Sequence, residues 1–153
     1  MPPVRIGVVA AGKRARSLVE HAYTISDQQY LGCDPDDGYN YPHDLYEMFG
    51  TDEPEWMVDV SGLEAELSAV FSPSEGSRVA AAEIAAENGD GPALYDSFEA
   101  FRADAEFDVV MVCSPNHLHA DGVVPLLDDG HDVFCEKPLA ADLADHDRII
   151  AAA

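Results

Sequence analysis

The chain is poor in basic residues: 8 lysines and arginines stand against 30 aspartates and glutamates, and the formal net charge is −22. Nucleic-acid binding requires a basic face that meets the phosphates, so this composition excludes it. No apolar run reaches the roughly 18 residues that a membrane-spanning helix needs. The N-terminus also lacks the basic start and long apolar core of a signal peptide, so we expect a cytoplasmic protein without a membrane partner.

Cysteine is scarce as well. Cys33, Cys113 and Cys135 are odd in number and form no CxxC pair, and the latter two lie in apolar, strand-like stretches. A reduced thiol in such a stretch behaves as a small buried hydrophobe. We therefore favour free thiols over a disulfide framework.

The excess of carboxylates favours a halophile-like protein, because high salt screens the self-repulsion that such a charge causes. An ordinary acidic surface is the alternative. Four of the eight basic residues, Arg5, Lys13, Arg14 and Arg16, lie in the first sixteen positions around a glycine turn. We expect an anion to bind there.

Short apolar segments alternate with helical stretches along most of the chain. The patterns predict strands at 4–9, 67–71, 93–95, 108–113 and 131–135, followed by helices at about 13–22, 77–88, 97–102, 119–129 and 142–153. This order predicts a Rossmann-type, doubly wound parallel sheet in a three-layer α/β/α domain that spans residues 1–153.

Residues from about 23 to 64 interrupt this alternation and form an acidic insertion, with one short helix expected near 43–49. Its segment 34–38, Asp-Pro-Asp-Asp-Gly, suggests a calcium loop. The glycine falls one place early, however, and no glutamate stands at the closing position, so we favour a solvated acidic loop. The role of the insertion is left open.

The first strand enters a small-residue turn and then a helix, which is the opening of a dinucleotide-binding unit. The three positions that are usually glycine read Ala10, Gly12 and Ala15. Gly12 keeps room for the pyrophosphate, whereas Ala10 puts a methyl group where a tight turn prefers glycine. We expect the pyrophosphate at the helix N-terminus, beside Ala10, Gly12, Lys13 and Arg14.

Two further motifs follow the fourth and fifth strands. Residues 113–119 read Cys-Ser-Pro-Asn-His-Leu-His, and residues 136–139 read Glu-Lys-Pro-Leu. Together with the N-terminal turn, they resemble the Gfo/Idh/MocA family of NAD(P)-dependent oxidoreductases. The family's second domain, an open antiparallel sheet that carries substrate and further catalytic residues, has no counterpart here. The chain therefore resembles an N-terminal half that binds cofactor but turns over poorly by itself.

Residues after the fourth strand leave the sheet at the edge where open α/β sheets bind ligands. Ser114, Pro115, Asn116 and His119 therefore face the expected crevice, and the resemblance implies that Pro115 and Asn116 line the nicotinamide side. The alternative is a turn that only caps the next helix, with His119 opening that helix. His117 and His119 form an HxH pair without a third ligand at suitable spacing, so we expect no metal site.

Lys137 is one of only two lysines and follows the last strand. The resemblance implies that Lys137 is catalytic, reaching the nicotinamide ribose and the substrate hydroxyl to assist proton transfer. Glu136, also expected near the cofactor, would hold the turn or orient Lys137. Pro138 restricts Lys137 to extended geometry. The alternative is a surface ion pair.

The residue that ends the second strand distinguishes NAD from NADP. An acid there binds the ribose 2′-hydroxyl, whereas a small polar residue with nearby cations accommodates a 2′-phosphate. Asp34 has the expected spacing from Gly12, but Ser72 is followed at once by a helix and a third strand. We prefer Ser72, and expect NADP, bound by Ser72, Ser74 and Arg78 together with Arg14, over NAD.

The sequence thus predicts the cofactor-binding portion of an NAD(P)-dependent dehydrogenase that oxidises a CH–OH group of a polyol, sugar or related hydroxy compound. The alternative is a non-catalytic dinucleotide-binding module with a sensor or assembly role. Substrate identity and association into a homo-oligomer are left open.

Overall fold

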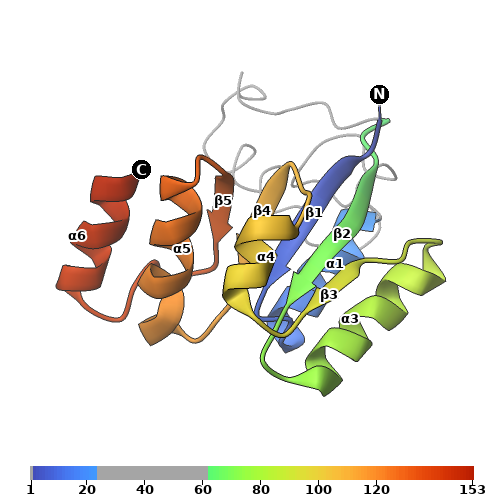
Figure 1. The fold of residues 1–153 in the computed structure, drawn as a ribbon, viewed down its shortest axis with the longest axis horizontal. Coiled ribbons are helices and arrows are strands. Elements are labelled where there is room, and N and C mark those ends of the chain that lie inside the picture. Colours follow the sequence, from blue (N-terminus) through green and yellow to red (C-terminus); the bar gives the residue numbers. More distant parts are fainter. Residues whose placement is uncertain (1, 24–61) are drawn as a thin grey trace, which may run out of the picture.

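The computed structural model describes residues 2–23 and 62–153, which form one five-stranded parallel sheet with helices on both faces (Figure 1). The strand order is β3-β2-β1-β4-β5. The chain therefore winds in one direction from β1 to β3 and in the other from β4 to β5. The predicted Rossmann-type α/β fold is confirmed, and its switch point lies between β1 and β4.

The strands are short and their bounds lie close to the predicted ones. They are β1 (Val4–Val9), β2 (Ala65–Phe71), β3 (Ala93–Tyr95), β4 (Val109–Val112) and β5 (Asp132–Cys135). Every neighbouring pair is parallel. Near-continuous apolar sequence marks such strands because both faces of a parallel sheet are covered.

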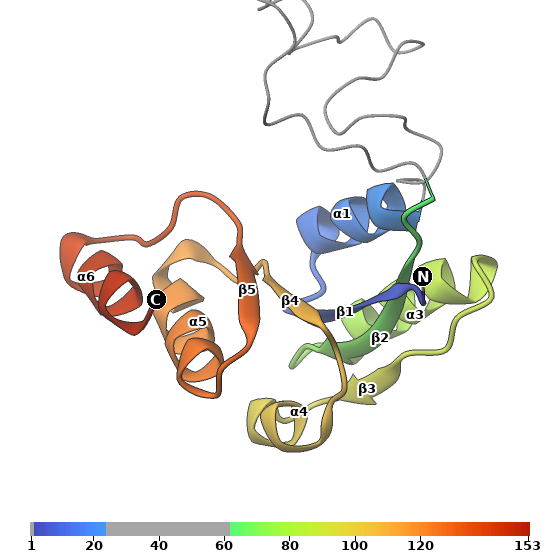
Figure 2. The same cartoon turned by 90° about the horizontal axis from the view of Figure 1, so that it is seen from above.

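The helices divide between the two faces of the sheet (Figure 2). They are α1 (Lys13–Tyr23), α3 (Glu75–Glu87), α4 (Phe98–Asp104), α5 (His119–Asp128) and α6 (Leu143–Ala152), with the 3₁₀ turn η2 (Asn116–Leu118) before α5. α1 and α3 cover one face, α4 and α5 cover the other, and α6 packs outside α5. No helix in the described part of the chain is long and apolar enough to cross a membrane.

The start of α3 and the turn η2 differ from the sequence prediction. α3 begins two residues before the predicted start at 77, because the Ser74 hydroxyl caps it by accepting a hydrogen bond from the Ser77 N–H at 3.4 Å. The turn η2 was not predicted. The expected helix at 43–49, Cys33, and Asp34 with its acidic loop lie outside the described residues.

The core on the α4 side of the sheet is built around aromatic rings. Phe101 is fully buried and packs against the rings of Phe71, Tyr95, Phe98 and Phe107. The α1 side is filled instead by small and aliphatic side chains of the sheet, α1 and α3. These two cores hold the strand ends in place.

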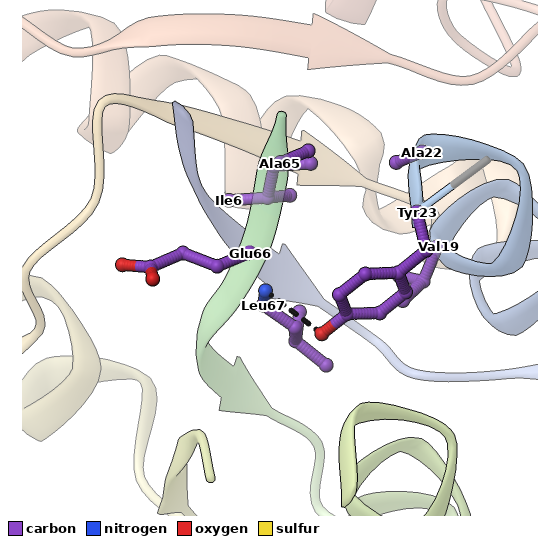
Figure 3. A pocket seen from close by; sticks show the side chains of 7 residues that line it. All are labelled: Ile6, Val19, Ala22, Tyr23, Ala65, Glu66 and Leu67. Atoms are coloured by element: carbon purple, nitrogen blue, oxygen red, sulfur yellow. Dashed lines mark hydrogen bonds between the residues drawn. The ribbon is translucent and has the colours of Figure 1, made fainter. Parts of the chain in front are cut away.

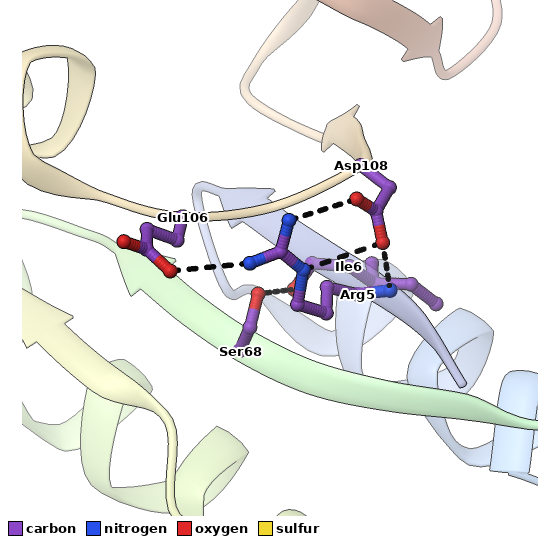
Figure 4. Close-up of polar contacts among 5 residues, drawn as sticks. All are labelled: Arg5, Ile6, Ser68, Glu106 and Asp108. Carbon is purple, nitrogen blue, oxygen red and sulfur yellow. Dashed lines mark hydrogen bonds and ion pairs between the residues drawn. The ribbon is translucent and has the colours of Figure 1, made fainter. Parts of the chain in front are cut away.

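Arg5 lies at the amino end of β1, opposite the glycine turn (Figure 4). Its guanidinium donates to both oxygens of Asp108, at 2.9 and 3.4 Å, and to Glu106 at 3.2 Å. The hydrogen bonds with Arg5 lower the pKa of the Asp108 carboxyl. The expectation that Arg5 gathers with the other cations at the anion site is therefore wrong, because its side chain secures β1 to the segment before β4.

Tyr23 fixes the last turn of α1 to the sheet (Figure 3). Its hydroxyl accepts a hydrogen bond from the Leu67 N–H at 3.0 Å and donates one to Asp90 at 2.7 Å. Burial, followed by the bond to Asp90, raises the pKa of Tyr23. This anchor holds the carboxyl end of α1, so the position of the opposite end, which follows the glycine turn, is also restrained.

Candidate functional site

The predicted site residues follow β1, β2, β4 and β5. All of these parallel strands end at the same edge of the sheet, so the residues come together there. The ladder continues past the strand ends: the Ala10 N–H donates to the Phe71 carbonyl at 2.8 Å, and the Glu136 N–H donates to the Val112 carbonyl at 3.0 Å. The glycine turn is thereby bonded to the end of β2, and the Glu-Lys-Pro turn to the end of β4. Segments more than a hundred residues apart in the chain thus share one crevice.

The glycine turn is tight and open towards its outer side. Ala10 has a φ of 66°, in the left-handed region, and the Gly12 N–H donates to the Ala10 carbonyl at 2.7 Å. A non-glycine residue in this conformation costs about 1–2 kcal/mol, which is the penalty that the sequence suggested for Ala10. Among the described residues, a Cβ on Gly12 would have only the Ala10 oxygen, at 4.0 Å, within reach. A phosphate can therefore approach the backbone where α1 begins.

Two of the three cations of the turn have partners, and the third does not within the described residues. Arg16 donates to the Ala11 carbonyl at 3.0 Å, and Arg14 donates from Nε to Glu136 at 3.0 Å. The bond from Arg14 lowers the pKa of Glu136. Lys13 is exposed and makes no hydrogen bond or ion pair within the described residues. Lys13 is thus the cation of this turn that is available to an anion.

β2 ends at a hydroxyl side chain. Ser72 is 5% exposed, and its Oγ accepts a hydrogen bond from the Ser74 N–H at 3.3 Å. The Arg78 guanidinium donates to the Ser72 carbonyl, and its other N–H groups have no partner in the described part of the chain. β2, the strand that pairs with β1, ends at Phe71, and Ser72 follows it directly, as expected. Arg14, which the sequence placed with this group, instead reaches the β5 side of the crevice.

A cavity of about 250 Å³ opens between the ends of β1, β2 and β4. Its walls include the apolar side chains of Phe71, Pro73, Phe98 and Leu118. Ser114 also lines it, and the Ser114 Oγ is buried without a hydrogen-bond partner among the described residues. Leaving a buried hydroxyl unpaired costs about 1–3 kcal/mol. Asp121 lines the cavity as well, beside these apolar side chains, and a mostly apolar slot of this kind suits a planar ligand.

The turn after β4 presents Pro115 and Asn116 to solvent and turns His119 inward. His119 is 1% exposed, and its ring nitrogens lie 2.9 Å from the Pro138 carbonyl oxygen (Nδ1) and 2.7 Å from the Ser114 carbonyl oxygen (Nε2). His117 is exposed. The HxH pair therefore does not converge on a common point, and no three His, Cys, Asp or Glu side chains within 2–23 and 62–153 are placed to hold a metal ion.

The turn after β5 carries an exposed Lys137 whose ammonium has no hydrogen bond or ion pair in the described ranges. Glu136 beside it is largely covered and paired with Arg14. At the neighbouring thiols, burial, then Glu136, raises the pKa of Cys113 to about 11 and raises that of Cys135 as well. Lys137 is thus an exposed cation at this end of the crevice that has no ion-pair partner among the described residues.

Comparison with known proteins agrees with this geometry. The model of an oxidoreductase family with an NAD-binding Rossmann fold, Gfo/Idh/MocA, matches residues 46–153. The chain belongs to this family. Among curated members, a D-xylose 1-dehydrogenase (NADP⁺) of Haloferax volcanii is 42% identical over 82 residues, 54% of this chain and 24% of that protein. A scyllo-inositol 2-dehydrogenase (NADP⁺) of Bacillus subtilis is 36% identical over 88 residues, 58% and 26% of the respective chains.

Solved structures of dehydrogenases share the fold. The WlbA dehydrogenase of Chromobacterium violaceum, in complex with NADH and UDP-GlcNAcA, has a TM-score of 0.65 at 19% identity. The match covers 100% of this chain and 32% of the WlbA chain. Myo-inositol dehydrogenase of Lactobacillus casei, in complex with NAD(H) and myo-inositol, has a TM-score of 0.63 at 21% identity, over 98% of this chain and 33% of that one. The chain thus spans about a quarter of the length of these curated relatives and a third of these solved chains.

Several residues of this candidate site were not predicted from the sequence. Phe71, Pro73, Phe98 and Leu118 line the cavity but come from three separate segments, and each reads as ordinary core or turn sequence. The only available signal was position, since Phe71 and Pro73 flank the predicted end of β2. The partners of His119 are backbone carbonyls, which carry no sequence signal at all.

Proposed function

We propose that the chain is the cofactor-binding portion of an NAD(P)-dependent dehydrogenase that acts on a polyol, sugar or related hydroxy compound. The observation that carries this proposal is the unpaired ammonium of Lys137 at the carboxyl end of β5, on the same edge as the glycine turn and the Ser114 cavity. The curated relatives named above are NADP⁺-dependent dehydrogenases of xylose and scyllo-inositol, which supports the same class.

The residues present fit a nicotinamide dinucleotide. The N-terminus of α1, the open backbone at Gly12 and the exposed Lys13 suit the pyrophosphate. The apolar cavity, with the unpaired Ser114 hydroxyl, suits the adenine. Pro115 and Asn116 then lie towards the nicotinamide, which when bound accepts or supplies hydride. His119 is excluded from direct contact by its burial.

Lys137 has the chemistry of a proton-transfer group. An ammonium on a flexible stem can hold a substrate hydroxyl and take part in moving its proton as the carbon is oxidised. Glu136 is ion-paired with Arg14, which is the first cause of its lowered pKa, and the nearby Lys137 contributes less. This pairing leaves the Lys137 ammonium free to face the crevice.

We also propose that the cofactor is NADP. β2 ends at Ser72, which lacks the carboxylate that would bind a 2′-hydroxyl and repel a 2′-phosphate. Arg78 lies against the Ser72 carbonyl and has N–H groups free for a phosphate. Charge-assisted hydrogen bonds of this kind are worth more than neutral ones.

The cofactor proposal is tested by titrating NADPH and NADH into the chain and following nicotinamide fluorescence. We expect NADPH to bind more tightly, and Arg78→Ala to weaken NADPH by about tenfold while changing NADH little. Because Arg78 also supports the Ser72 carbonyl, an equal loss for both cofactors would show a merely structural role. Tighter NADH binding by the native chain would assign the 2′ position to an acid such as Asp34.

The catalytic proposal is tested with the chain joined to the substrate-binding portion of a related sugar dehydrogenase. Lys137→Ala should lower turnover by about a hundredfold or more while most cofactor affinity is kept. Lys13→Ala removes the same charge from the glycine turn and should weaken cofactor binding instead. Unchanged turnover in Lys137→Ala would contradict the dehydrogenase role and favour a dinucleotide-binding module without hydride transfer.

A further inference from the structure

His119 joins the two turns that carry the proposed nicotinamide site. Its ring lies between the Ser114 carbonyl, on the turn after β4, and the Pro138 carbonyl, on the turn after β5. These turns belong to different strands. The nearest ladder bond between them, from the Glu136 N–H to the Val112 carbonyl, precedes both Lys137 and Pro138. The ring is therefore a direct polar link beyond the end of the sheet.

Both partners of the ring are carbonyl oxygens, which only accept hydrogen bonds. A neutral imidazole carries one N–H, so it can donate to one of the two turns and leaves a bare nitrogen facing the other oxygen. With the side chain 1% exposed, no solvent-facing position is left for that nitrogen. Only a ring with a proton on each nitrogen satisfies both contacts, at 2.9 and 2.7 Å.

We propose that His119 is a positioning residue that holds a proton on both ring nitrogens and clamps the Lys137 turn to the Ser114–Asn116 turn. Its role is to set where Lys137 lies relative to the nicotinamide side of the crevice. The role in placing Lys137 rests on the proposed dehydrogenase function. The donation of hydrogen bonds from both ring nitrogens does not depend on that function.

The ring itself is tested by ¹⁵N-histidine labelling and long-range ¹H–¹⁵N correlation spectra of the chain. His119 should show two protonated nitrogens with slowly exchanging N–H protons, because both are buried in hydrogen bonds. The exposed His117, two residues earlier, provides the internal comparison. A single N–H on His119 in these spectra overturns the clamp, whatever the chain is found to bind.

The positioning role is tested with His119→Phe, His119→Gln and the matched surface variant His117→Gln. The probes are NADPH and adenosine 2′,5′-bisphosphate, which lacks the nicotinamide half. We expect His119→Phe to weaken NADPH by about tenfold and the bisphosphate by less than twofold, because both turns lose the ring but the segment before Ser114 keeps the bond from the Cys113 N–H to the Val9 carbonyl at 3.0 Å. His119→Gln keeps a donor and should recover part of the loss, and His117→Gln should match the native chain.

Equal losses for the two probes in His119→Phe would mean that the ring supports the whole domain, and unchanged NADPH binding would mean that it supports nothing at this site. Either result overturns the positioning role. If the native chain binds neither probe, the proposed function and the positioning role fail together, and the nitrogen spectra still decide whether the ring donates to both turns.

Discussion

Gly7, in the middle of β1, is the position where the addition of one methyl group should be most disruptive. A Cβ at Gly7 would lie 2.7 Å from Cδ1 and 2.9 Å from Cγ of Phe107, and 3.2 Å from Cζ of Phe101. The Phe107 ring has little room to retreat, because it stacks on Phe101 at 5.3 Å and packs tilted against His131 at 4.7 Å between ring centroids. Gly7→Ala must therefore displace a packed ring.

The expected loss of stability follows from two opposing terms. Overpacking a core costs about 1–3 kcal/mol, while replacing glycine by alanine inside a strand regains about 0.5–1 kcal/mol. The net effect spans about 0–2.5 kcal/mol, and we expect a value near the middle, a free energy of unfolding lower by about 1–1.5 kcal/mol. With a urea m-value of roughly 2 kcal/mol/M, the midpoint of urea unfolding should fall by about 0.5–1 M.

Two variants sharpen the measurement. Gly76, in the first turn of α3, is exposed, and a methyl group added there would meet no other side chain of residues 2–23 and 62–153 within 4 Å, so Gly76→Ala should stabilise the chain by about 0.5–1 kcal/mol. In a Phe107→Ala background the methyl group at position 7 should cost less stability, because only the 3.2 Å contact with Phe101 remains tight. If Gly7→Ala proves as stable as the native chain, the packing argument for this core is refuted.

Three further outcomes test the turn, the ion pairs and the overall charge. Ala10→Gly should raise the free energy of unfolding by about 1 kcal/mol, because the left-handed φ no longer meets a methyl group; a loss in urea unfolding would contradict this. Arg5 lowers the pKa of Asp108, so this pair stabilises the fold above the ordinary carboxyl pKa and ceases to do so as the pH falls through the lower native value. Asp108→Asn should accordingly flatten the loss of stability below about pH 4, and an unchanged acid profile would argue against it. With a net charge of −22, thermal melts should shift upwards as KCl shortens the screening length from about 10 Å at 0.1 M to about 3 Å at 1 M; melting temperatures that stay constant would exclude the halophile-like interpretation.

Most of the fold was predictable because each element carries its own local signal. β4 and the other strands are short apolar runs, and α3 ends close to Gly89 as predicted. The errors lie where a cap or a tight turn decides a boundary. The Ser74 hydroxyl extended α3 towards its N-terminus, and the turn at Asn116 wound into 3₁₀ geometry before α5.

The candidate site was predictable in position but not in its contacts. Gly12, Ser72, Ser114 and Lys137 each follow a strand, and each was expected at the crevice for that reason. Their neighbours were not foreseen, because the direction and reach of a side chain depend on which strand lies beside its own. Arg14 illustrates this, since it pairs with Glu136 on the far side of β4 and not with the Ser72 group.

The sequence by itself determined the order of strands and helices, and with it the shared edge on which the glycine turn, Ser114 and Lys137 lie, because all strands of a parallel sheet end on the same side. Only the tertiary structure decided the partners: Arg5 with Asp108 at the opposite edge, Arg14 with Glu136 across the crevice, and His119 between two carbonyls. The physical reason is that periodicity is a local property of the chain. Hydrogen bonds between turns are made only when packing brings distant backbone groups within about 3 Å.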